Sequence, residues 1–332
     1  MDNLQQLRDW TGRISGIANG YKLSQVLFTA LNGGVFELLQ SPATADEVAN
    51  ALQWSKRGTA MLLDGLVAVD LVDKQDKRYC NNEVAAACLV EGGAAYQGHI
   101  LRHSNASWDA WKTLPERVRT GTCGDASEDW SGEALRNFIL GMRDIAQISA
   151  REVLEMVDLA GYTNMLDLAG GPATYAITFL LAHPQLRATL FDMPDVIDIA
   201  REEVAAAGVQ DRFNYIAGDC MRDSLDDGYD MVFMSNIIHS FSLEENAALV
   251  KRVYEALAPG GTIIIKDFIL ENDRTGPAFA LIFALHMLVH TPAGNTYTFD
   301  EIKDWTDNAG FVNGRAASLT PQTRLWVAEK PA

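Results

Sequence analysis

The sequence predicts an α/β protein with a mainly helical first half and a doubly wound parallel sheet in its second half. Two observations predict this fold. In the first half, apolar residues recur every three or four positions, the period of a helix that buries one face. In the second half, five short apolar runs alternate with helical segments, as in a parallel sheet with helices on both faces. A length of 332 residues accommodates the two parts as separate domains.

The charge of the chain disfavours two classes of partner. Lys and Arg total 27 and Asp and Glu total 44, so the formal net charge is −17. Residues 1–150 contribute 14 − 18 = −4, and residues 151–332 contribute 13 − 26 = −13. A nucleic-acid surface needs clustered Lys and Arg, and so does an anionic membrane surface. We therefore expect neither nucleic acid nor a membrane as partner.

Cysteine usage and the length of the apolar runs indicate the compartment. The four cysteines show no CxxC spacing, which is typical of reduced thiols in the cytosol. The N-terminus has no apolar signal core. The longest apolar stretch, residues 278–289, is too short to span a bilayer. We expect a soluble cytoplasmic protein.

The first half shows clear helix boundaries. Apolar positions in residues 23–35 lie on one helix face. Thr44 with Glu47 three residues later forms a capping box for a helix that ends near Leu52. Ser55 is a suitable N-cap for the next helix, through residue 69. These segments predict three consecutive helices.

Residues 71–80 have the pattern of a short β-hairpin, so the first half predicts three helices followed by a two-stranded wing, a winged-helix pattern. A further amphipathic helix begins near Trp108 and is stopped by Gly121, and another runs from Gly132 to Val157. We predict three segments: a winged-helix domain over 1–120, a helical connector over 121–155 and a sheet domain over 156–332.

The strands and helices of the sheet domain follow one another in regular order. The predicted strands are Asn164–Leu168, Ala188–Phe191, Phe213–Ile216, Met231–Met234 and Thr262–Ile265. The predicted helices are Thr174–Ala182, Val196–Ala207 and Glu244–Leu257, and residues 257–261 are expected to form a tight turn before the last strand.

A loop of small residues, 169–173, follows the first strand and leads into a helix at Thr174. Such a loop lets a ligand approach the backbone, and the helix N-terminus offers free N–H groups. The dinucleotide fingerprint GxGxxG would need glycine at positions 169 and 174, where the chain has alanine and threonine. The loop alone therefore does not specify the ligand.

Polar residues also follow the next three strands. Asp192 closes the second strand, Asp219 closes the third, and Ser235 and His239 follow the fourth. A carboxylate at 192 can bind both ribose hydroxyls of an adenosine ligand, and one at 219 can accept from an adenine amino group. Each residue alone also fits a turn cap or a solvent-facing side chain. Because the ends of parallel strands meet at one edge, the set predicts a nucleoside site.

At this point the chain resembles the small-molecule O-methyltransferase family that uses S-adenosylmethionine, with its caffeate-type and acetylserotonin-type enzymes and their bacterial relatives. The resemblance covers nearly the whole chain. It is carried by the segments 167–174, 191–194, 218–220, 236–239, 259–261, 290–294 and 108–121, and by the winged-helix N-terminus.

The resemblance implies a Rossmann-like class I methyltransferase domain after an N-terminal, mainly helical winged-helix dimerisation domain, and an intertwined homodimer. S-adenosylmethionine is the implied cofactor. The implied cofactor-binding residues are Asp167, Ala169, Gly170, Gly171, Asp192, Met193, Asp219, Cys220 and Ser235. His239 falls on the family's general base, and an imidazole suits the removal of a hydroxyl proton.

Two departures from the family pattern concern this base. The base is commonly followed by Asp-Trp, whereas His239 is followed by Ser240 and Phe241. One family acid that orients the base falls on Thr296, and the other falls on Asp267. His239 and Asp267 are thus the implied catalytic pair. A histidine with fewer acids around it is a weaker base, which leaves room for a thioether sulfur or an enolised carbon as methyl acceptor.

The acceptor side is predicted to include Met142 and Arg143 on the connector, and Met287 and His290 on a later helix. An ordinary ion pair is the alternative for Arg143, and a core stripe is the alternative for the later helix. His239, Asp267 and His290 would suit a metal, but a proton-transfer pocket explains the same residues, so we expect no metal.

The leading hypothesis is a homodimeric methyltransferase that O-methylates a small hydroxylated metabolite. S-methylation of a small thioether acid, as in the dimethylsulfoniopropionate pathway, is the alternative within the class, with C-methylation beside it. A winged-helix DNA-binding regulator is a second class, opposed by the net charge of −4 in its half. A nicotinamide dehydrogenase is a third, opposed by the missing glycines at 169 and 174.

Overall fold

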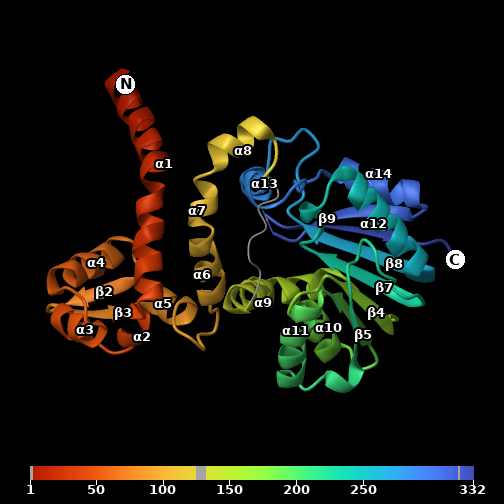
Figure 1. Cartoon of the computed structure of the whole chain (residues 1–332), viewed down its shortest axis with the longest axis horizontal. Coiled ribbons are helices and arrows are strands. Elements are labelled where there is room, and N and C mark those ends of the chain that lie inside the picture. The colour runs from red at the N-terminus through yellow and green to blue at the C-terminus, as the bar shows by residue number, and fades with distance from the viewer. Residues whose placement is uncertain (1–2, 125–131, 321) are drawn as a thin grey trace. The chain divides into compact units, whose positions relative to one another are not determined.

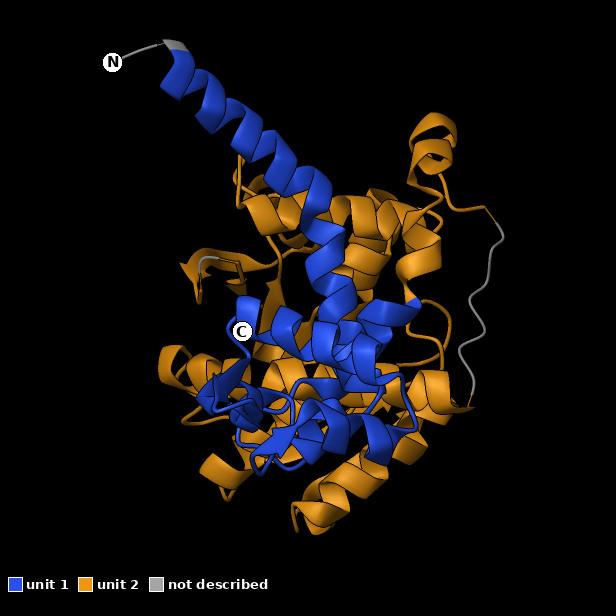
Figure 2. Cartoon of the chain, turned by 90° about the vertical axis from the view of Figure 1, so that its left-hand side faces the viewer, with its two compact units in different colours: residues 1–106 blue, residues 107–332 orange. Residues whose placement is uncertain are grey.

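The structure of the chain is a computed structural model that describes residues 3–124, 132–320 and 322–332. The chain consists of two compact units, Met1–Ala106 and Ser107–Ala332 (Figure 2). The sequence places the end of the first domain at residue 120. In the structure, the helices between 107 and 120 belong to the second unit, because they pack on a helix of that unit. Residues 125–131 of the predicted connector 121–155 lie outside the described residues.

Unit 1 combines helices with a small antiparallel sheet of order β1-β3-β2 (Figure 1). Its helices are α1 (Asn3–Asn32), α2 (Val35–Leu38), α3 (Ala45–Leu52), α4 (Lys56–Ala68), α5 (Glu83–Cys88) and α6 (Gly98–Ala106). Its strands are β1 (Ala43–Thr44), β2 (Val72–Gln75) and β3 (Arg78–Asn81). The predicted hairpin over 71–80 is confirmed as β2 paired with β3.

The helix caps predicted in unit 1 are present. The Thr44 hydroxyl accepts a hydrogen bond from the Glu47 N–H, and the Glu47 carboxylate accepts one from the Thr44 N–H. Ser55 caps α4 in the same way, without the reciprocal bond. The first helix differs from the prediction because it ends at Asn32 rather than at residue 35. Gly34 adopts a left-handed conformation with φ 73°, which separates α1 from α2.

Unit 2 is an α/β unit. Its helices are α7 (Trp108–Trp111), α8 (Leu114–Thr120), α9 (Gly132–Met156), α10 (Thr174–Ala182), α11 (Pro194–Ala206), α12 (Leu243–Ala256), α13 (Ala278–His290) and α14 (Phe299–Ala309), with short 3-10 turns η1 (Gln210–Arg212) and η2 (Ile238–Ser240). Its strands are β4 (Asn164–Leu168), β5 (Arg187–Asp192), β6 (Phe213–Ala217), β7 (Tyr229–Ser235), β8 (Leu257–Asp267), β9 (Val312–Ser318) and β10 (Arg324–Glu329).

The helix expected from Trp108 to Gly121 is divided into α7 and α8. Pro115 lies in the first turn of α8, where its missing N–H needs no partner, and proline disfavours helical continuity on its N-terminal side. Gly121 ends α8 in the left-handed conformation, as predicted. The division changes the helix count but leaves Trp111 beside α13.

The seven strands of unit 2 form one sheet of order β6-β5-β4-β7-β8-β10-β9. All five predicted strands are present, and β4 to β8 pair in parallel. The sheet is nevertheless mixed, because β10 runs antiparallel to both β8 and β9. Neither β9 nor β10 is predicted from the sequence. The prediction of a tight turn over 257–261 is wrong, because β8 already begins at Leu257. The pairing of β8 with β7 is irregular there, since its register shifts between Leu257 and Thr262.

Two apolar cores lie on opposite faces of the sheet. Alanine, phenylalanine and valine side chains of α9, α10 and α11 form one core with alternate residues of β4, β5 and β7. The helices α12 and α14 cover the other face (Figure 1). Successive strand residues therefore enter different cores, as Met165 and Leu166 do. No helix in the described parts of the chain is long and apolar enough to cross a membrane.

Candidate active site

The carboxyl ends of β4 to β8 form one edge of the sheet. Leu168 pairs with Phe191 on one side and with Met234 on the other, so these three strands end level with one another. Asp267 is the last residue of β8. The polar residues predicted from the sequence lie at this edge or in the segments that leave it, as expected for an open parallel sheet.

The loop that follows β4 has an unusual backbone. Ala169 and Ala173 both adopt left-handed conformations, with φ 54° and 59°, and Gly171 has φ 57°. A Cβ carbon on alanine costs about 1–2 kcal/mol in this region, so the two alanines store strain that glycine would avoid. Gly170 is confined for another reason: a Cβ there would lie 2.4 Å from the carboxyl carbon of Asp167.

Asp167 is fully buried under this loop. Neither carboxylate oxygen has a hydrogen-bond partner among the described residues. Burial and the nearby Asp192 charge together raise the pKa of this carboxyl to about 7, against an opposing effect of the Ala176 main-chain N–H. A buried acid without partners is costly, which indicates a position for a positively charged ligand group.

Asp192, at the end of β5, is tied to the loop. One carboxylate oxygen accepts a hydrogen bond from the Gly171 N–H at 2.8 Å, and the other accepts from the Met193 N–H at 2.7 Å. Burial raises the pKa of Asp192, and the two N–H groups oppose that shift. Met193 contacts Asp192 through its main-chain N–H, and its side chain is 53% exposed.

The residues after β6 and β7 make local contacts. Asp219 accepts from the Met221 N–H at 2.9 Å and lies 3.4 Å from Arg222. Cys220 is buried, and burial raises the pKa of its thiol to about 11, which keeps it protonated at neutral pH. The Ser235 hydroxyl donates to the Asn236 side-chain oxygen at 3.1 Å.

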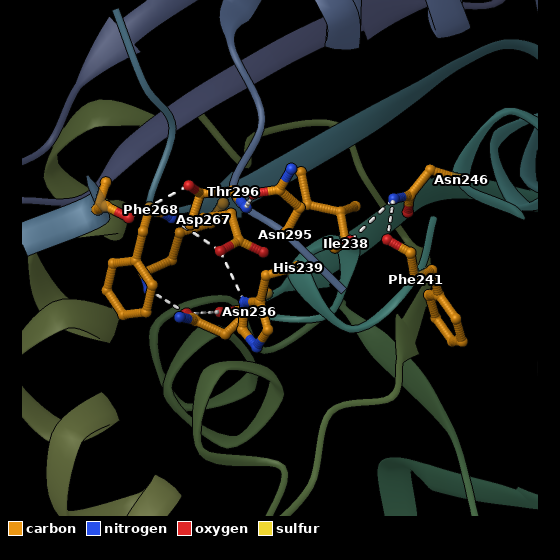
Figure 3. A network of polar contacts seen from close by, with 12 residues as sticks. Asn236, Ile238, His239, Phe241, Asn246, Asp267, Phe268, Asn295 and Thr296 are labelled. Atoms are coloured by element: carbon orange, nitrogen blue, oxygen red, sulfur yellow. Dashed lines mark hydrogen bonds and ion pairs between the residues drawn. The ribbon is translucent and has the colours of Figure 1, made fainter. Parts of the chain in front are cut away.

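His239 lies in η2 and faces Asp267 (Figure 3). Its Nδ1 is 2.8 Å from Asp267 Oδ1, and the two side chains are only 12% and 3% exposed. An ionised carboxylate only accepts hydrogen bonds, so Nδ1 carries a proton and Nε2 is left as the proton acceptor. Asp267 Oδ1 also accepts from the Phe268 N–H at 2.8 Å, which fixes the carboxylate.

The segment 294–296 supports the same histidine through its main chain. The Asn295 N–H donates to the His239 carbonyl at 2.9 Å. Gly294 permits this approach, because a Cβ there would lie 2.4 Å from the His239 carbonyl oxygen. The Thr296 hydroxyl points elsewhere and donates to the Ala280 carbonyl at 3.2 Å. The position where the family pattern has a second acid thus supports α13 instead of the base.

A row of aromatic rings extends from His239 along α13. Phe283 lies edge-on to His239 with ring centroids 4.9 Å apart, and the rings continue through His286 to His290. Phe268 packs on Phe283 at 4.6 Å. Five residues recur on this helix at the spacing of one face: Phe279, Phe283, His286, Met287 and His290. Met287 is buried, whereas Phe279 is 41% exposed. Phe283 and Phe268 thus place aromatic rings beside His239.

The connector residues have different surroundings. Arg143 Nη1 lies 3.1 Å and 3.2 Å from the two carboxylate oxygens of Glu203 on α11, and Nη2 lies 3.5 Å from Asp144. These contacts favour the ion-pair alternative for Arg143 over the binding of an acceptor carboxylate. Met142 is half-buried on α9.

Several residues around His239 have no role in the sequence prediction. Phe268 directly follows Asp267 at the end of β8, a position that the strand pattern marks. Asn246 and Tyr297 contact the turn of His239 from other elements, and no local pattern marks them. Across the described ranges, no group of three His, Cys, Asp or Glu side chains is arranged to hold a metal ion.

The strand order, the acids at the carboxyl edge and the buried histidine–aspartate pair together define an S-adenosylmethionine-dependent methyltransferase. The sequence profile of the O-methyltransferase domain matches residues 125–312, and that of the O-methyltransferase dimerisation domain matches residues 15–91. The chain belongs to the O-methyltransferase family, which uses S-adenosylmethionine.

Individual relatives cover nearly the whole chain. A 3-hydroxy-5-methyl-1-naphthoate 3-O-methyltransferase of Streptomyces sahachiroi is 32% identical over 90% of this chain and 88% of its own. The acetylserotonin O-methyltransferase of Gallus gallus is 31% identical over 94% of both chains. The crystal structure of human N-acetylserotonin methyltransferase in complex with S-adenosylmethionine has a TM-score of 0.89, with 26% identity over 100% of this chain and 99% of that one.

Proposed function

We propose that this protein methylates a hydroxyl group of a small molecule and that His239 removes the hydroxyl proton. The observation that carries the proposal is the 2.8 Å contact between His239 Nδ1 and the buried Asp267 carboxylate. Bound S-adenosylmethionine supplies a methyl group already activated on a sulfonium. The protein therefore has to align the acceptor and accept its proton.

His239 and Asp267 divide this task. Asp267 holds the Nδ1 proton, so Nε2 is directed at the acceptor hydroxyl and takes its proton as the methyl group is transferred. The negative carboxylate stabilises the imidazolium that forms. The aromatic wall of Phe268, Phe283 and His286 suits a flat, apolar acceptor placed against His239. Met287 and His290 on the same helix, with Met142 on α9, are proposed to complete the acceptor side.

The residues at the sheet edge fit the cofactor. The buried carboxylate of Asp167, which has no partner in the described chain, suits the ammonium of the methionine moiety beside the loop 169–171. Asp192, already fixed by two N–H groups, is proposed to bind the ribose with Met193 beside it. Asp219, Cys220 and Ser235 are proposed to lie around the adenine and the rest of the ligand.

Calorimetric titration tests the cofactor. We expect the full-length protein to bind S-adenosylhomocysteine and not NAD. Asp192→Ala is expected to weaken this affinity about 10- to 100-fold, because a hydrogen bond to a charged group contributes about 1.5–3 kcal/mol. Asp195→Ala, an exposed acid in the first turn of α11, is the matched control. An unchanged affinity in Asp192→Ala would contradict the ribose role, and binding of NAD would contradict the cofactor.

We also propose that the protein is a homodimer and that α1 forms part of the interface. Five apolar side chains recur at helical spacing on α1, here called the α1 stripe: Leu4, Leu7, Trp10, Ile14 and Ile17. Ile14 is 66% exposed and Ile17 is 73% exposed. Contiguous apolar surface of this kind is typical of protein–protein contacts. The stripe adjoins and enters the matched dimerisation domain, residues 15–91.

Light scattering after size exclusion measures the state. We expect twice the chain mass of 36.4 kDa for the wild-type protein, and the mass of one chain for the double variant Trp10→Glu with Ile14→Glu. Glutamate side chains on both sides of a symmetric interface would be desolvated without a partner. Arg8→Glu, on another face of α1, is expected to stay dimeric. A double variant that keeps the dimer mass would exclude the α1 stripe as the interface.

A further inference from the structure

The turn that carries His239 is held by a buried side chain from α12. Asn246 is fully buried, in the second turn of that helix. Its Nδ2 donates to the Ile238 carbonyl at 2.8 Å and to the Phe241 carbonyl at 3.3 Å (Figure 3). These two carbonyls flank His239 on both sides, so one amide group spans the turn.

The orientation of this amide is determined by its partners. The two groups hydrogen-bonded to it are carbonyl oxygens, which only accept, so the NH₂ end is assigned to point at them; the Tyr297 hydroxyl also lies beside this side chain. A flipped amide, or a carboxylate in its place, would bring oxygen against oxygen. The contact therefore depends on an NH₂ group at this position and not on polarity in general.

The N-terminal end of α12, which carries Asn246, is fixed by further hydrogen bonds. The N-terminus of α12 carries a complete capping box, in which Ser242 and Glu245 bond reciprocally. The buried Tyr297 hydroxyl donates to the same Phe241 carbonyl from outside the helix. The far end of the turn is held at Asn236, whose side-chain oxygen accepts from the buried Lys266 ammonium at 2.6 Å.

From this arrangement we infer that Asn246 is a positioning residue for the general base. This inference rests on the proposed role of His239. Asn246 acts through the main chain: by fixing the carbonyls on either side of His239, it sets the direction of the imidazole toward Asp267 and toward the acceptor. A displacement of about 1 Å in a reacting group can reduce turnover about 100-fold, so a main-chain anchor of the base affects the chemistry directly.

A burial argument supports the same inference. A polar amide in a fully buried position costs free energy, and an apolar residue of similar volume would pack there at lower cost. The Asn246 Nδ2 makes two hydrogen bonds, whereas its Oδ1 is buried with no partner among the described residues, so the position retains an amide despite a cost that only the bonds to the turn offset. The neighbouring α12 positions Leu249, Val250 and Val253 are apolar and belong to the core. Asn246 is thus the polar exception on a buried helix face, and its polar group is directed at the turn of the base.

The test uses Asn246→Leu in the full-length protein, with an NMR readout that requires no methyl acceptor. The Nδ1 proton of His239, held by Asp267, gives a downfield imidazole resonance that is assigned by its loss in His239→Gln; the chain has six histidines. We expect Asn246→Leu to lose or broaden this resonance, because the ring moves relative to Asp267. Binding of S-adenosylhomocysteine, measured by calorimetry, is expected to be unchanged.

Thr306→Val is the matched control. Thr306 is also fully buried in unit 2, donates to the Ile302 carbonyl at 3.1 Å and accepts from Trp326 at 3.2 Å, but it does not touch the turn. It should keep the His239 resonance whatever its melting temperature. A wild-type resonance in Asn246→Leu, with either a lower or an unchanged melting temperature, would overturn the inference.

Asn246→Ser is the second variant if Asn246→Leu does not fold. Serine is too short to span both carbonyls, so the resonance is again expected to be lost. Its retention in folded Asn246→Ser would overturn the inference. The proposed function fails separately: if His239→Ala keeps its turnover while Asn246→Leu loses the resonance, Asn246 positions the ring but the ring is not the base.

Discussion

Replacing His239 with alanine is expected to lower kcat for a hydroxyl acceptor by about 100- to 10,000-fold, the usual contribution of a positioned general base. Affinity for S-adenosylhomocysteine should not change, because the predicted cofactor residues lie at the ends of β4, β5, β6 and β7 while His239 lies in η2. Asp267→Asn should also lower kcat, since an amide can donate to Nδ1 and thereby turn the imidazole into the wrong tautomer.

The experiment combines single-turnover rates with calorimetry on the same preparations. His183→Ala is the matched control, because His183 lies at the C-terminal end of α10, where the chain leads into the amino end of β5. Near-normal turnover in His239→Ala would contradict the general-base role. That outcome would favour an acceptor that needs no deprotonation, such as a thioether sulfur or an enolised carbon.

The second large effect is expected at Asp167, where stability and binding should change in opposite directions. Asp167→Asn should stabilise the ligand-free protein by up to about 4 kcal/mol at pH 8, because the carboxyl pKa is raised from 3.8 to about 7 and one pKa unit corresponds to about 1.4 kcal/mol. The same change should weaken S-adenosylmethionine binding about 100-fold, by removing the carboxylate that pairs with its ammonium.

The sign of the pH dependence follows from the direction of this pKa shift. Between pH 4 and pH 7 the folded, ligand-free protein binds more protons at Asp167 than the unfolded chain does. Its stability therefore falls as the pH rises through this window, and the loss is complete above pH 7. Asp167→Asn should remove this part of the pH dependence, as measured by urea unfolding at pH 5 and pH 8. Asp195→Asn, at an exposed site, is the control.

Binding should also release a proton. Pairing with an ammonium lowers the Asp167 pKa, so cofactor binding at pH 6 should release up to about one proton in the wild-type protein and fewer in Asp167→Asn. Calorimetry in two buffers of different ionisation enthalpy measures the number. Equal release by the two proteins would show that Asp167 does not receive the ammonium.

Much of the fold could be predicted because it depends on local patterns. Capping at Thr44 and Ser55 needs only residues within one helical turn, and the five parallel strands are short apolar runs bounded by turns. Of the two missed strands, β10 does contain a short apolar run, at residues 325–328, and could have been predicted in the same way, whereas β9 lacks this pattern. The edge strand β9 is exposed along most of its length and contains Asn313 and Gly314, so its pairing with β10 depends on the sheet already present.

In the site too, some features could be predicted from local sequence and others depend on tertiary contacts. The placing of Asp192, Asp219 and His239 at the sheet edge could be predicted, because the ends of parallel strands must meet at one edge whatever the rest of the chain does, whereas Asp167 is implied by the family resemblance. Which side chains contact one another was not decided by position. Thr296 donates a hydrogen bond to Ala280 on α13, and Arg143 pairs with Glu203. Local sequence does not predict these contacts, because the partners are distant in sequence and approach only after folding.

The sequence by itself determined the class of the fold and the sheet edge at which polar residues gather, since both follow from residue type and order along a strand–helix repeat. The resemblance to the family implied the cofactor and the role of His239. The charge of −13 in the second half is consistent with a cationic methyl donor that carries no phosphate. Only the tertiary structure decided how His239 is held. The Asp267 carboxylate on β8 and the Asn295 N–H after α13 bond His239 itself, and the buried Asn246 amide on α12 bonds the turn around it. Contacts between such distant segments are selected by packing and not by local sequence.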